Sequence, residues 1–164
     1  MPLHYLFRPL LLARIFVQDE FGKLYINCSA IKCLPRELMQ NVLWGGVNKL
    51  SIGENSFVSF DNFFDLTDRI TIGSDVHIAM RCTFITSTHE IGPHERRASS
   101  EISAPIIIED GCWIGGNVTV LPGVTIHKGA IIGAGSVVNK DCDSDKIYAG
   151  VPAREIRSLD EAWK

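Results

Sequence analysis

The sequence predicts an all-β protein, a parallel β-helix in which every six residues make one short strand and a turn. Three observations predict this fold. Aliphatic residues recur at every sixth position over residues 108–138, a glycine often follows them, and a small or slim residue holds the fifth place of most units. A six-residue period fits neither a helix of 3.6 residues per turn nor a simple array of hairpins.

Three such units make one triangular coil, so residues 18 positions apart stack on each other. The period therefore places Ile108 on Ile126 and Ile114 on Ile132. Their spacing is expected to be the roughly 4.8 Å that separates neighbouring strands. The core should then be a ladder of aliphatic side chains.

The repeat is interrupted twice. The units that begin at Ile52, Val58 and Phe64 are displaced by two residues around the sequence LTDR, residues 66–69. The second interruption, FITSTHEIGPHERRASS, replaces the aliphatic pattern with His, Glu, Gly, Pro and Arg. We expect it to form a loop, at about residues 88–104, that protrudes from the coil.

Composition and charge exclude several classes of function. The chain has 164 residues, 46% of them hydrophobic and 21% charged, which suits one globular domain. A net charge of −3 argues against nucleic-acid binding, because no broad basic surface is available to phosphates. The apolar stretch PLHYLFRPLLLARIFV is too short and too charged to span a bilayer, so membrane contact is expected to be peripheral at most. It also lacks the order of a signal peptide.

The cysteines follow the repeat. Cys82, Cys112 and Cys142 all hold the fifth place of a unit, where a small buried side chain fits. Cys28 and Cys33 lie outside the clear repeat and are given no role. An odd number of cysteines without a CxxC pair predicts neither a disulfide framework nor a zinc knuckle. A reducing, cytoplasmic setting is expected.

The segment IIIEDGCWIGGNVTVLPGVTIHKGAIIGAGSVVNKD, followed by YAGVPAREIRSL, resembles the hexapeptide-repeat acyltransferases. It is most similar to the sugar O-acetyltransferase branch, which includes the galactoside, maltose and nodulation-factor acetyltransferases, and the resemblance covers residues 50–158. It implies a left-handed coil, a homotrimer with active sites between subunits, and acetyl-CoA as the acyl donor without a metal. The acceptor is expected to be a hydroxyl or amine of a sugar.

Three segments are expected along the chain. Residues 1–50 should pack on the coil or extend it, residues 51–152 should form the β-helix with the catalytic site, and residues 153–164 should form a short helical tail.

Acyl transfer to a hydroxyl or amine needs a base that takes the acceptor's proton. Of the five histidines, His77 and His127 lie inside regular units and His4 lies in the N-terminal segment. His89 ends a strand and opens the second interruption, and the resemblance puts the general base at this TH position. His94, within the expected loop, is predicted to lie on the surface or to contact the acceptor.

The coenzyme site is expected along one vertical column. Gly116, Ala134 and Pro152 are spaced by 18, and small side chains there would let an extended pantetheine arm lie against the coil. The resemblance puts these positions in contact with acetyl-CoA.

Cations should hold the phosphates of the coenzyme. Lys140, Arg154 and Arg157 are the candidates, although an ordinary surface position also explains Arg157. The resemblance adds Asn139 to this set.

Two further residues are expected near the acceptor. Trp113 matches a tryptophan that flanks the active site in the resembling enzymes. Asp61 falls where related sugar acetyltransferases carry an asparagine. The added negative charge favours an amino sugar.

Other interpretations remain open. The γ-class carbonic anhydrases use the same coil and a His-x4-His pair of zinc ligands, a spacing that His89 and His94 share. However, position 53, where the third histidine is expected, is glycine, and a catalytic zinc keeps three protein ligands. A non-catalytic assembly module and a serine-type amino-acid acetyltransferase are the remaining alternatives.

Overall fold

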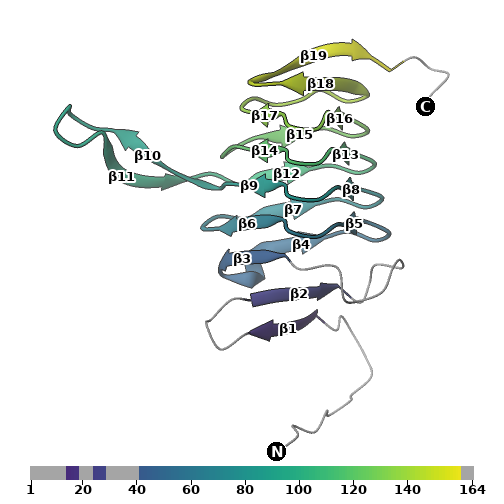
Figure 1. Ribbon diagram of the computed structural model, residues 1–164, viewed down its shortest axis with the longest axis horizontal. Coiled ribbons are helices and arrows are strands. Elements are labelled where there is room, and N and C mark those ends of the chain that lie inside the picture. The colour runs from purple at the N-terminus through teal and green to yellow at the C-terminus, as the bar shows by residue number, and fades with distance from the viewer. Residues whose placement is uncertain (1–13, 19–23, 29–40, 160–164) are drawn as a thin grey trace, which may run out of the picture.

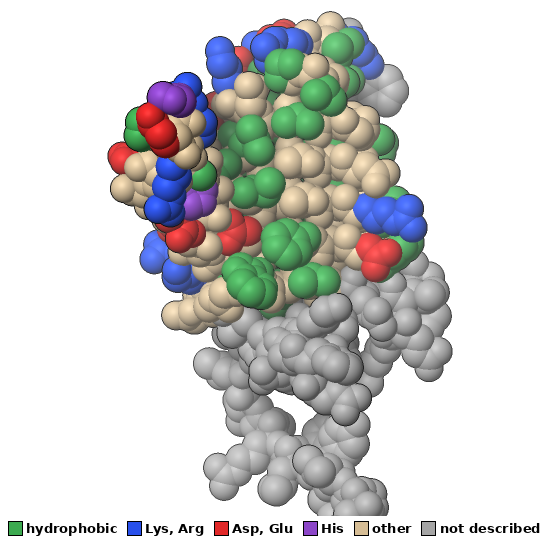
Figure 2. Space-filling model, turned by 60° about the vertical axis from the view of Figure 1, so that its left-hand side comes forward, with side chains coloured by type: hydrophobic (Ala, Val, Ile, Leu, Met, Phe, Trp, Pro, Cys, Tyr) green, Lys and Arg blue, Asp and Glu red, His purple; other side chains and the backbone are tan. Residues whose placement is uncertain are grey.

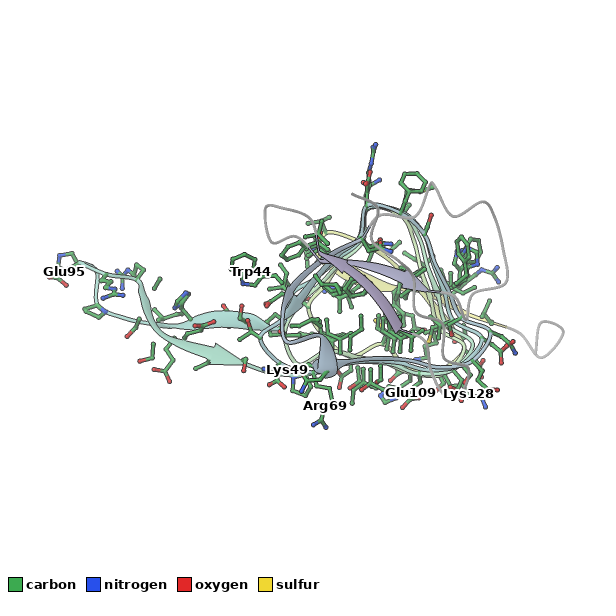
Figure 3. All side chains as sticks on the ribbon, turned by 90° about the horizontal axis from the view of Figure 1, so that it is seen from below. Trp44, Lys49, Arg69, Glu95, Glu109 and Lys128 are labelled. Carbon is green, nitrogen blue, oxygen red and sulfur yellow. The ribbon has the colours of Figure 1, made fainter. Side chains whose placement is uncertain are left out.

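The computed structural model describes residues 14–18, 24–28 and 41–159. Stacked β-strands wind around one axis and enclose a triangular cross-section, which Figure 3 shows end-on. The only helical element among the described residues is the 3₁₀ turn η1 (Val47–Lys49). The expected all-β solenoid is confirmed.

The strands form three walls, which we name sheets A, B and C (Figure 1). In spatial order, sheet A contains β1 (Arg14–Gln18), β2 (Leu24–Cys28), β3 (Val42–Gly45), β6 (Phe63–Leu66), β9 (Thr83–Phe84), β14 (Thr119–Val120) and β17 (Val137–Val138). Sheet B contains β15 (Thr125–Ile126), β12 (Ile106–Ile108), β7 (Ile70–Ile72) and β4 (Leu50–Ile52). Sheet C contains β19 (Ala153–Ser158), β18 (Lys146–Gly150), β16 (Ile131–Ile132), β13 (Trp113–Ile114), β8 (His77–Ile78) and β5 (Phe57–Val58).

Each coil runs through sheet B, then C, then A, and turns at three corners. We call these the B–C, C–A and A–B corners after the sheets that they join. The parallel pairing places Ile108 beside Ile126 and Ile114 beside Ile132, as the period predicts. These four side chains are at most 1% exposed, so the aliphatic ladder is the core.

The two interruptions both lie at the A–B corner. Phe64 pairs with Phe84, which is 20 positions away rather than 18. The two additional residues therefore lie in the turn from β6 to β7. The second interruption leaves the same corner one coil later, after β9.

The second interruption is a β-hairpin rather than an irregular loop. Strands β10 (Ser87–Ile91) and β11 (Ala98–Ser103) pair antiparallel, and the hairpin projects far from the coil (Figure 1). Its protrusion matches the sequence prediction.

The prediction of a C-terminal helix is wrong for those residues of the segment that the structure describes. Residues Ala153–Ser158 form β19, which pairs antiparallel with β18. Without β19, the outer edge of β18 would leave its backbone N–H and C=O groups unpaired. The antiparallel return of the chain as β19 supplies their hydrogen-bond partners. Residues 160–164 lie outside the described part of the chain.

At the other end, β2 pairs antiparallel with β3, and β3 continues sheet A in parallel with β6. The remainder of the expected N-terminal segment, residues 1–13, 19–23 and 29–40, lies outside the described residues. In the part that is described, no helix has the length and apolar character needed to cross a membrane.

Candidate active site

His89 lies on β10, close to the root of the hairpin, and its side chain is exposed. Its Nδ1 atom is 3.0 Å from the backbone oxygen of Ser99 on the facing strand. A carbonyl oxygen only accepts hydrogen bonds, so Nδ1 is the nitrogen that carries the proton. In the neutral form of the ring, Nε2 then keeps its lone pair. This is the tautomer that a general base needs.

His94 lies in the turn of the hairpin rather than beside His89. Its Nδ1 atom is 3.2 Å from Oε1 of Glu95, and Figure 3 shows Glu95 at the far tip. The structure therefore does not bring the two histidines together as a pair of metal ligands. In residues 41–159, no three His, Cys, Asp or Glu side chains gather in a way that would hold a metal ion.

Gly116 and Ala134 lie at one level of the C–A corner, because Ile114 pairs with Ile132. A Cβ atom at Gly116 would lie 3.2 Å from Sδ of Met80, so any side chain at this position would press against Met80.

Pro152 does not continue this column. Ile132 pairs with Tyr148, which is 16 positions away, because the last coil is two residues shorter than the others. Gly150 is therefore the residue level with Ala134. Pro152 lies beyond it, in the turn from β18 to β19.

The expected phosphate-binding residues lie in two places. Asn139 and Lys140 follow β17 at the A–B corner, whereas Arg154 and Arg157 lie on β19 at the outer edge of sheet C. Within the described residues, none of these cations forms an ion pair. The guanidinium of Arg154 donates to the backbone oxygen of Ala153 at 2.8 Å.

Trp113 and Asp61 also lie apart. Trp113 is 54% exposed on the outer face of sheet C, directly beside His77 in the neighbouring strand. Asp61 lies at the C–A corner with a positive φ of 58°. Nε of Arg81, one coil further on, is 3.8 Å from its Oδ2, which places a positive charge beside the acid.

Figure 2 shows sheet A from outside, between the hairpin and the C–A corner. The face is uncharged over most of its area, with hydrophobic side chains set among uncharged polar groups and backbone, and the charged side chains lie on the hairpin and along the margins. Trp44, 69% exposed, lies on β3 beside Asp65 of the neighbouring strand β6, on the side of the coil from which the hairpin projects (Figure 3). The hairpin and the C–A corner thus border an uncharged wall.

The three cysteines of the repeat are buried free thiols, as the sequence predicts. Burial raises the pKa of Cys112 to about 11 and that of Cys142 to about 12, with a smaller contribution from nearby carboxylates. Burial also raises the pKa of Cys82. None of the three supplies a thiolate nucleophile near neutral pH.

Sequence reasoning missed two partners of the site. Ser99 holds the His89 ring through its backbone, so its side chain gives no signal. The second is Asp65, a buried carboxylate beneath the root of the hairpin. The two-residue displacement of the repeat next to it was the available signal.

Residues 105–140 match the family model described as "Bacterial transferase hexapeptide (six repeats)". A hexapeptide-repeat acetyltransferase from Vibrio cholerae, solved with acetyl-CoA, superimposes with a TM-score of 0.66 at 35% identity, and the match covers 77% of this chain and 74% of that one. The chain belongs to the hexapeptide-repeat acetyltransferases.

Two further members of this family are similar to the chain. A galactoside O-acetyltransferase of Escherichia coli is 38% identical over 118 residues, which are 71% of this chain and 58% of that protein. A galactoside acetyltransferase solved with coenzyme A superimposes with a TM-score of 0.70 at 30% identity, covering 81% of this chain and 64% of the other. The chain spans about half to two thirds of the length of the curated relatives that it matches.

Proposed function

We propose that this protein transfers the acetyl group of acetyl-CoA to a hydroxyl or amine of a sugar, with His89 as the general base. The observation that carries the proposal is the contact between His89 Nδ1 and the Ser99 carbonyl, which leaves Nε2 free to accept a proton. The complexes of two relatives with acetyl-CoA and with coenzyme A support the choice of donor.

The reaction proceeds by direct transfer. Nε2 of His89 removes the acceptor's proton while the acceptor oxygen or nitrogen attacks the thioester carbonyl. The carbon–sulfur bond then breaks, and the imidazolium returns its proton to the departing thiolate of coenzyme A. No acyl-enzyme is needed, in keeping with the protonated, buried thiols of the coil.

The site is shared between copies of the chain in a homotrimer. Within one chain, the hairpin leaves the A–B corner, whereas Gly116 and Ala134 lie at the C–A corner, across the full width of sheet A. Lys140, at the A–B corner, and Arg154, at the outer edge of sheet C, are also separated within one chain. We place acetyl-CoA between the hairpin of one subunit and the C–A corner of its neighbour, with the uncharged wall of Figure 2 turned toward the interface.

The acceptor can be identified by following release of the coenzyme A thiol. The purified protein is given acetyl-CoA with a panel of neutral sugars, amino sugars, nucleotide sugars and serine. Release that depends on a sugar is expected, and release with serine alone would favour the amino-acid acetyltransferase instead. His89→Ala should lower kcat by about 10² to 10⁴.

His127→Ala is the matched control, because His127 lies in the coil, 3.2 Å from Glu109 and away from the hairpin. It should keep a kcat close to that of the wild type. If His89→Ala is as active as His127→Ala, the base lies elsewhere.

A further inference from the structure

We propose that Asp65 is a positioning residue, which fixes the angle of the hairpin and thereby the place of His89. The proposal rests on the function proposed above, in which His89 is the base. Asp65 belongs to β6, in the coil below the hairpin, and is 4% exposed.

One carboxylate oxygen of Asp65 binds the beginning of the hairpin. Oδ2 accepts hydrogen bonds from the backbone N–H of Thr86 at 3.0 Å, and from the backbone N–H and hydroxyl of Ser87 at 2.9 and 2.7 Å. The other oxygen, Oδ1, accepts from the backbone N–H and hydroxyl of Thr67 at 3.0 and 2.7 Å. Asp65 therefore joins the displaced turn of its own coil to the first residues of β10.

The same turn also holds the end of the hairpin. The hydroxyl of Ser103, the last residue of β11, donates to Oδ2 of Asp68 at 3.2 Å. The backbone N–H of Asp68 donates to Oγ1 of Thr86 at 2.8 Å. Both strands of the hairpin thus rest on residues 65–68, and the two residues added to the repeat build this support.

Asp65 is charged whenever the enzyme works. Burial alone would raise its pKa, but the hydrogen bonds from Ser87 and Thr67 outweigh this and lower the pKa to about 2. Hydrogen bonds to an ionised acceptor are stronger than those between neutral groups. A carboxylate that accepts five of them at one junction makes that junction stiff.

A stiff root matters because the hairpin projects from the coil (Figure 1). His89 lies two residues beyond Ser87 on the same strand, which is roughly 7 Å at the usual rise of a β-strand. A tilt of about 10° at the root displaces the imidazole by roughly 1 Å. A displacement of that size can cost about 100-fold in rate.

The test compares Asp65→Asn with Ser56→Ala. The Asp65→Asn substitution keeps the volume but removes the charge and replaces one of the two acceptor oxygens by an amide N–H₂. Either the donors of Thr67 or those of Thr86 and Ser87 then lose their acceptor, and the junction is weakened. Ser56 is a matched control, because it is also buried and also joins two coils, donating to the Gly73 carbonyl and accepting from the Val76 N–H. It lies at the B–C corner, far from the hairpin.

Asp65→Asn should lower kcat about 10- to 100-fold with an unchanged KM for acetyl-CoA, and Ser56→Ala should change neither. Hydrogen–deuterium exchange should rise across residues 87–103 in Asp65→Asn and stay at the wild-type level in Ser56→Ala. Equal kcat in the two variants, or unchanged exchange in the hairpin, would overturn the proposal.

Ser87→Ala is a milder second variant, because it removes one hydrogen bond and leaves the backbone contacts. It should change kcat and hairpin exchange in the same direction, and it should add little in the Asp65→Asn background, since both act at one junction. The exchange measurement needs no substrate. If the wild type transfers no acetyl group, the proposed function fails, while the exchange data still decide whether Asp65 holds the hairpin.

Discussion

His89 Nδ1 and the Ser99 carbonyl oxygen, 3.0 Å apart, join the two strands of the hairpin next to the proposed reaction centre. Because the carbonyl accepts the Nδ1 proton, His89 should be found as the Nδ1-protonated tautomer at neutral pH. ¹⁵N chemical shifts of labelled histidine would show it, with assignment by comparison with His89→Ala. A dominant Nε2-protonated form would contradict the proposed base.

Lys140→Ala and Arg154→Ala should each raise the KM for acetyl-CoA about tenfold or more at unchanged kcat, since a hydrogen bond to a charged group contributes on the order of 1.5 to 3 kcal/mol. The effect should shrink as salt is added. Lys128→Ala is the control, because Lys128 lies exposed at the B–C corner. A fall in kcat with unchanged KM would show that the cations do not bind the phosphates.

Substitution of Asp61 tests whether the acceptor is an amino sugar. If it receives the ammonium group of an amino sugar, Asp61→Asn should raise the KM for amino sugars several-fold and leave neutral sugars unaffected. Arg81, 3.8 Å away, compensates part of the negative charge, so Arg81→Gln should act in the opposite direction. Equal changes for both classes of sugar would show that Asp61 does not select the acceptor by charge.

The pKa of Asp65 predicts how stability depends on pH. Its folded-state pKa of about 2 lies below the ordinary value of 3.8. The group therefore stabilises the fold above about pH 4, and this contribution is lost as the pH falls toward 2. Linkage puts the loss at about 2 kcal/mol. Chemical denaturation at pH 7 and pH 2.5 should show a smaller loss for Asp65→Asn than for the wild type.

Regular features of the molecule were predictable from sequence because they repeat. The stacking of Ile108 on Ile126 follows directly from the six-residue period, and so does the burial of Cys112. The break at His89 was visible for the same reason. In a repeat, the sequence pattern of one coil predicts which residues of the next coil are buried, without knowledge of other tertiary contacts.

What the sequence did not predict depends on contacts outside the repeat. The two-residue shortening that moves Pro152 out of the coenzyme column occurs after Val138, where the sixth positions are Ser144 and Gly150 and carry no aliphatic marker. Strand β19 forms because β18 offers a free edge, which local propensity does not reveal. The support of the hairpin by Asp65 joins residues more than 20 positions apart.

The shared site can be tested by mixing two inactive variants. His89→Ala lacks the base, and Gly116→Trp fills the C–A corner, where even a Cβ atom would meet Met80. If each site takes its hairpin from one subunit and its C–A corner from the next, some sites in a mixed trimer combine an intact hairpin with an intact corner. Random exchange at equal amounts makes this about a quarter of all sites.

Refolding the variants together should therefore restore about a quarter of wild-type activity, while each variant refolded alone stays inactive. Sedimentation should show trimers in all three samples. Trimers without restored activity would place the hairpin and the corner of each site in the same chain.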